Sequence, residues 1–244
     1  MAGLVPEAIE YNFGGFPVSL VMTGLVWALL GAVSFVVIRK RGLIPGRLQS
    51  LFEILFESIY SLNVDMFGDQ ARKYFPLFIC LFIFIAAGNL LGLIPGFSSP
   101  ASDLSLTASL ALIVFVYYNY QGFRSRGIGY LKHFLGPELP WYLFPVRAII
   151  ALLEIIAIFV RPFSLALRLF CNIMSKELLL AILGVLLVKF FFSPDYLEKL
   201  MAAAPFLLRP AIILLGVLVG LIQGFVFMAL SMSYVASAIQ LEHV

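Results

Sequence analysis

Six charged residues interrupt a stretch of the chain that is otherwise apolar. They lie between positions 148 and 192 and are Glu154, Arg161, Arg168, Lys176, Glu177 and Lys189. A charge at the centre of a membrane helix costs about 2.5–3.5 kcal/mol on insertion scales, so residues of this kind mark ion pathways and proton relays. Arg168 has leucine on both sides and lies far from either end of the stretch. The sequence therefore predicts movement of an ion or proton.

On a helix these charges fall on two faces. A polar stripe lies within about 80° of Arg168, at about 100° per residue, and contains Glu154, Arg161, Asn172 and Lys176. Glu177 lies about 180° from Arg168 and about 13.5 Å further along the axis. This geometry suits two separate aqueous pockets with Arg168 between them. The alternative is a ladder of internal ion pairs, but three cations then face two carboxylates, so we expect an acidic partner from outside this stretch.

The last apolar segment contributes the polar side chains of Gln223 and Tyr234. In the same segment Gly216, Gly220 and Gly224 repeat at every fourth position, which permits close contact with another helix. Gly220 and Gln223 lie within about 60° of one another. We predict that Gln223 takes part in the ion path and that the three glycines serve close packing. The alternative for Gln223 is that it only forms a hydrogen bond with a neighbour.

The composition of the chain is that of a membrane protein, so we expect membrane helices to position these polar residues. Of 244 residues, 62% are hydrophobic and 12% charged, and the mean hydropathy is +1.06. A soluble domain carries about 25% charged residues. The net charge of +3 is too small for nucleic-acid recognition. The chain contains no phosphate-binding loop, no dinucleotide fingerprint and no His-Glu-x-x-His motif. We therefore predict no cofactor, no metal site, no nucleotide site and no enzymatic activity.

We predict a single all-α membrane domain over residues 1–244. It has five membrane segments plus one amphipathic helix at the membrane surface, residues 47–62, whose apolar residues recur at three and four. The five segments are 16–38, 74–97, 104–121, 145–192 and 203–241. Lysine and arginine gather in 39–73 and 122–147, which places both in the cytoplasm. The N-terminus then lies outside and the C-terminus inside.

Three stretches together resemble subunit a of the F-type ATP synthase. The first is Pro162-Phe-Ser-Leu-Ala-Leu-Arg168-Leu-Phe-Cys-Asn172, followed by Glu177. The second is Leu221-Ile-Gln223-Gly-Phe-Val-Phe-Met-Ala-Leu, which ends in Tyr234 and is similar to the last helix of the family. The third is Asn89-Leu-Leu-Gly-Leu-Ile-Pro95-Gly, similar to its second spanning helix and turn. The similarity covers essentially the whole chain.

The resemblance implies a stator subunit beside a rotating ring of c subunits and next to the peripheral stalk b subunits. It also implies that the last two segments form a strongly tilted hairpin against the ring, with Arg168 facing the ring carboxylates. Asn172, Glu177 and Gln223 match family positions that line or border the ion path. Glu154 matches an acidic position of the family near the cytoplasmic half-channel. The setting implied is a bacterial inner membrane rather than a thylakoid-type membrane. A proton is the favoured ion, and Na⁺ is the alternative, because the ligands that choose between them would lie on the ring.

Two positions depart from the family pattern. Lys176 stands where the family often has a small residue, and Gly216 where it often has histidine or glutamate. Both concern the outer side of the ion path, so the proton chemistry there differs from that of many relatives.

Two other classes of protein remain as alternatives. A self-contained secondary transporter or channel often shows inverted repeats, and this chain shows none. An intramembrane enzyme would need a nucleophile with a base, or metal ligands, at membrane depth. Neither is found in the sequence.

Overall fold

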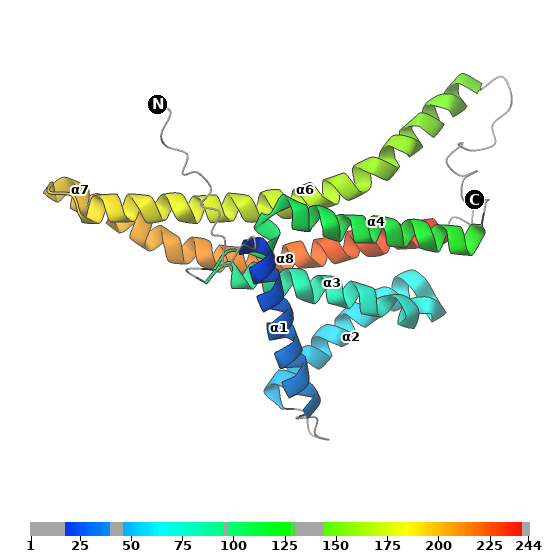
Figure 1. The fold of residues 1–244 in the computed structure, drawn as a ribbon, viewed down its shortest axis with the longest axis horizontal. Coiled ribbons are helices and arrows are strands. Elements are labelled where there is room, and N and C mark those ends of the chain that lie inside the picture. The colour runs from blue at the N-terminus through cyan, green and yellow to red at the C-terminus, as the bar shows by residue number, and fades with distance from the viewer. Residues whose placement is uncertain (1–17, 40–45, 95–96, 128, 130–143, 241–244) are drawn as a thin grey trace. The chain divides into compact units, whose positions relative to one another are not determined.

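The computed structural model describes residues 18–39, 46–94, 97–127, 129 and 144–240, and Figure 1 shows its fold. These residues form helices joined by short turns, and no strand occurs among them. The predicted all-α class is confirmed for this part of the chain. The longer helices are α1 (Val18–Arg39), α2 (Arg47–Phe67), α3 (Ala71–Leu91), α4 (Leu104–Arg126), α6 (Phe144–Phe191) and α8 (Ala203–Gln240). Short elements are η1 (Gly68–Gln70), η2 (Pro100–Ser102) and α7 (Tyr196–Met201).

Four stretches of the described chain are long and apolar enough to cross a membrane. They are Val18–Phe35, Phe52–Leu91, Val146–Phe191 and Tyr196–Ile239. The predicted segment 104–121 forms α4 but is not among the four, and the predicted surface helix 47–62 forms α2, which continues to Phe67. The chain is thus an α-helical protein with several membrane-length apolar helices.

The boundaries of α2 and α3 follow from glycine. Gly68 has a φ of 55°, in the left-handed region that glycine adopts without strain, and it separates the two helices. No helix breaker precedes it, so α2 extends past position 62. α3 includes the basic pair Arg72 and Lys73, so it begins before the predicted membrane segment, which starts at position 74. It ends at Leu91.

The described chain divides into two compact units, each built from non-contiguous segments. The first contains residues up to 51, 83–103 and 171–224. In it, α1 contacts η2, and the Trp27 ring lies 5.3 Å from that of Phe84. Pro100 and Ala101 of η2 are buried. This packing fixes the turn that follows α3.

The second unit contains residues 52–82, 104–170 and those from 225 onwards. Aromatic ring contacts join its helices. The Phe67 ring lies 4.8 Å from that of Tyr74 and 5.8 Å from that of Phe78, which joins the end of α2 to α3. The Phe115 ring lies 6.5 Å from that of Phe159, which joins α4 to α6.

Candidate functional site

A carboxylate held by a backbone amide forms the centre of the site in the first unit. The N–H of Ser99 donates to Oε1 of Glu177 at 2.8 Å. Ser99 is 1% exposed, and the Ser102 hydroxyl donates to its carbonyl oxygen at 2.7 Å. A hydrogen bond to a charged group is about twice as strong as one between neutral groups. The turn after α3 therefore orients the carboxylate of α6.

Gly92 lets this turn approach. A Cβ atom added at Gly92 would lie 2.6 Å from Cβ of Ser99 and 2.8 Å from its backbone nitrogen. Carbon atoms in ordinary contact are about 3.5–4.0 Å apart, so no larger residue fits without displacing Ser99. The position of the amide that binds Glu177 depends on Gly92, the residue directly after α3.

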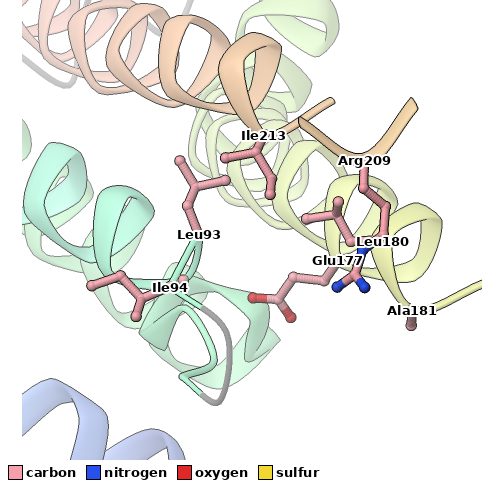
Figure 2. A pocket seen from close by; sticks show the side chains of 8 residues that line it. Leu93, Ile94, Glu177, Leu180, Ala181, Arg209 and Ile213 are labelled. Atoms are coloured by element: carbon pink, nitrogen blue, oxygen red, sulfur yellow. The ribbon is translucent and has the colours of Figure 1, made fainter. Parts of the chain in front are cut away.

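The Glu177 side chain lines an open pocket of about 190 Å³ (Figure 2). The apolar part of the lining consists of Leu93, Ile94, Leu180, Ala181 and Ile213. Arg209 of α8 supplies the other charged side chain of this pocket. A single water takes about 30 Å³ in the liquid, so several waters fit beside the carboxylate.

Lys176 extends between α3 and α8. Its ammonium donates to the carbonyl oxygen of Asn89 at 3.4 Å. A Cβ atom added at Gly216 would lie 3.0 Å from Cδ of Lys176 and 2.8 Å from Cδ2 of Leu93. The absence of a side chain at Gly216 therefore makes room for the Lys176 stem and for Leu93.

Two amide hydrogen bonds join α3 and α6 to α8. Nδ2 of Asn89 donates to the carbonyl oxygen of Gly220 at 3.0 Å, and Nδ2 of Asn172 donates to Oε1 of Gln223 at 3.3 Å. Within the described chain, Oδ1 of Asn89 and Nε2 of Gln223 are buried and have no hydrogen-bond partner. Buried polar atoms of this kind are usually satisfied by water. Gly224 is buried on α8.

The second unit holds the other predicted charges. Arg168 is exposed, whereas its neighbours Leu165 and Leu169 are buried. In the described part of this unit no hydrogen bond or ion pair to Arg168 occurs. The Arg161 guanidinium lies 5.7 Å from the centre of the Tyr234 ring, a cation–π contact. Glu154 is half-buried on α6.

The structure thus brings together four of the predicted polar residues with two of the predicted glycines in the first unit. They are Asn172, Lys176, Glu177 and Gln223, with Gly216 and Gly220. Sequence reasoning did not assign Asn89, Gly92, Ser99 or Arg209 to the site. Asn89 carried a usable signal, because it is an amide in an apolar helix. Ser99 carried none, since it acts through its backbone.

The fold and the site define an α-helical membrane protein with charged and amide side chains on membrane-length helices. Comparison with known families narrows this class. The model of the family described as ATP synthase A chain matches residues 19–236, and the chain belongs to this family.

Several curated proteins are similar over most of their length. "ATP synthase subunit a" of Oleidesulfovibrio alaskensis is 37% identical over 235 residues, which cover 95% of this chain and 91% of that protein. "ATP synthase subunit a 2" of Syntrophotalea carbinolica is 38% identical over 241 residues, 99% of this chain and 93% of that protein. "ATP synthase subunit a" of a Sulfurihydrogenibium species is 38% identical over 220 residues, which cover 90% of this chain and 96% of that protein.

Proposed function

We propose that this chain is the membrane subunit through which protons pass in an F-type ATP synthase, where it works beside a ring of c subunits. The observation that carries the proposal is the set of polar groups on α3, α6 and α8. A pocket with room for water reaches Glu177. Buried amide atoms of Asn89 on α3 and of Gln223 on α8 have no hydrogen-bond partner within the described chain. In an apolar helix bundle such groups are costly unless they serve a hydrated path.

Glu177 is the proton acceptor of the outer half-channel in this proposal. Water in its pocket delivers the proton, and the Ser99 amide holds the carboxylate in a fixed direction. The amide pair of Asn172 and Gln223 then provides donors and acceptors for the next step of the path.

Arg168 separates the two half-channels. An exposed cation on a membrane-length helix needs an anionic partner, and a carboxylate of the c-ring supplies it. The nearby cation favours the ionised form of a ring carboxylate that faces it, whereas the carboxylate must be neutral where it faces lipid. Arg168 also repels a cation that would pass directly between the half-channels.

The inner half-channel leads past Glu154, with the Arg161 and Tyr234 pair nearby in the same unit. The orientation follows from the basic segments, which puts residues 39–73 and 122–147 in the cytoplasm. The N-terminus then lies outside, the C-terminus inside, and the membrane is a bacterial inner membrane. We include α4 as a fifth membrane segment and place the first part of α2 at the membrane surface.

Rotation sums the energy of several protons. One elementary charge that crosses 100 mV releases about 2.3 kcal/mol, which is too little to make one ATP. The chain therefore works with the c-ring and is held by the peripheral stalk b subunits. A self-contained transporter is not favoured, because the chain belongs to the ATP synthase A chain family.

Replacing Arg168 tests this function. Inverted membrane vesicles that contain the assembled enzyme with Arg168→Ala should show no ATP-driven proton pumping, measured as quenching of an acridine dye. Lys189→Ala, an exposed cation later on the same helix, is the control and should pump at the wild-type rate. Wild-type pumping by assembled Arg168→Ala enzyme would refute the proposal.

A further inference from the structure

Pro162 lies inside α6, six residues before Arg168. Proline has no backbone N–H, so it cannot donate to the carbonyl oxygen of the residue four positions earlier. That residue is Ile158. In a helix that crosses a membrane, a carbonyl without its helical donor needs another one, because lipid offers none.

Tyr118 of α4 supplies this donor. Its hydroxyl donates to the carbonyl oxygen of Ile158 at 3.4 Å, a long hydrogen bond. The Tyr118 side chain is only 2% exposed. Its ring lies 5.5 Å from that of Phe115, edge to face, and 6.2 Å from that of Tyr234. The ring is therefore held from two sides, and its hydroxyl reaches the one α6 carbonyl that Pro162 deprives of a partner.

We infer that Tyr118 is a positioning residue for proton translocation: its hydroxyl replaces the hydrogen bond that Pro162 removes from α6, and it thereby fixes the direction in which α6 presents Arg168. The inference rests on the proposed function, because it assigns Tyr118 a part in the work of Arg168. The residues involved, Tyr118, Ile158, Pro162 and Arg168, all belong to the second unit.

A small change in the helix direction at Pro162 displaces Arg168 by a distance that affects its function. Six helical residues span about 9 Å, so a change of about 10° in the helix direction at Pro162 moves the Arg168 backbone by about 1.5 Å. Prolines are the commonest places where helices kink, and a carbonyl without a fixed donor leaves the kink angle loosely defined. A misplacement of about 1 Å at a reacting group can lower a rate about 100-fold.

Tyr118→Phe removes the hydroxyl and keeps the ring. We expect ATP-driven pumping per assembled enzyme to fall about three- to tenfold, in line with the loss of one buried hydrogen bond. Tyr120→Phe is the matched control, because Tyr120 lies on the same helix and is 55% exposed. Its pumping should equal that of the wild type. Equal rates for the two variants would overturn the inference.

A second substitution separates this role from simple packing. Pro162→Ala restores a backbone N–H that can donate to Ile158, so the Tyr118 hydroxyl becomes dispensable. Tyr118→Phe should then lower pumping in the wild-type background but leave it unchanged, within about 1.5-fold, in the Pro162→Ala background. The same fold-loss in both backgrounds would overturn the inference. Pro162→Ser is made in parallel, so that the comparison can be made in whichever of the two backgrounds assembles.

Arg168→Ala is measured in the same vesicles. If it pumps like the wild type, the proposed function fails. If it does not pump while Tyr118→Phe matches Tyr120→Phe, only the role of Tyr118 fails.

Discussion

Replacing Gly92 by alanine tests whether the turn after α3 orients the Glu177 carboxylate. The added Cβ atom would lie 2.6 Å from Cβ, 2.8 Å from N and 2.9 Å from Cα of Ser99. Two of these three atoms are backbone, so a side-chain rotation cannot relieve the contact. The turn itself must move.

The size of the effect follows from these distances. Restoring a carbon–carbon separation of about 3.5 Å requires a shift of about 1 Å. The same shift lengthens the 2.8 Å bond from the Ser99 amide to Glu177 beyond the usual limit for a hydrogen bond. A hydrogen bond to a charged group contributes about 1.5–3 kcal/mol. Since about 1.4 kcal/mol corresponds to a factor of ten, we expect proton pumping to fall about tenfold or more.

The assay is ATP-driven pumping in inverted vesicles, divided by the amount of assembled enzyme. Gly88→Ala is the control, because Gly88 lies one turn earlier in α3 and its added Cβ would meet Pro100 at 3.6 Å, an ordinary contact. Gly88→Ala should pump at a rate close to the wild type. If Gly92→Ala pumps as well as Gly88→Ala, the backbone amide of Ser99 does not position Glu177, and the reasoning is refuted.

Two further predictions concern the amide pair and the orientation. Asn172→Ala leaves Oε1 of Gln223 without its donor at 3.3 Å and should lower pumping about tenfold, whereas Asn119→Ala on α4 should not; equal losses would exclude a specific role for the pair. For the orientation, the native cysteines Cys80 and Cys171, which are free and exposed, are first replaced by serine. A cysteine at the exposed Phe97 should then react with an impermeant thiol reagent from the outer face, and one at the exposed Ser125 only in inverted vesicles; the reverse pattern would overturn the topology.

Side-chain chemistry made the polar part of the candidate site predictable from the sequence. Glu177, Asn172 and Gln223 are polar residues in apolar segments. Placing such residues in a membrane costs free energy, so their presence in the sequence indicates a functional site. The spacing of Gly216 and Gly220 likewise indicated a close approach of another helix. Which residues approach was not predictable, because Leu93, Lys176 and Asn89 come from other elements.

Backbone groups explain most of what the sequence could not predict. The amide of Ser99 binds Glu177, and an amide group looks the same at every position except proline. Gly92 matters only because the chain folds back towards it after α3. The predicted membrane segment 74–97 and the helix α3 have different bounds for a related reason. The segment was defined by the uncharged residues after Lys73, whereas the helix begins after the turn at Gly68 and includes Arg72 and Lys73.

Sided access of silver ions tests most directly the claim that two half-channels flank Arg168. Silver binds thiolates in water-filled regions and is small enough to enter where a proton passes. Ala181→Cys places a thiol in the pocket of Glu177 and leaves that carboxylate in place. Ala157→Cys places one on α6, about one turn from Glu154.

Both variants are made in the background without Cys80 and Cys171, which serves as the control and should resist silver. Silver should inhibit the variant at position 181 only from the outer face and the variant at position 157 only from the inner face. Inhibition of both from the same face, or of neither, would contradict the two half-channels.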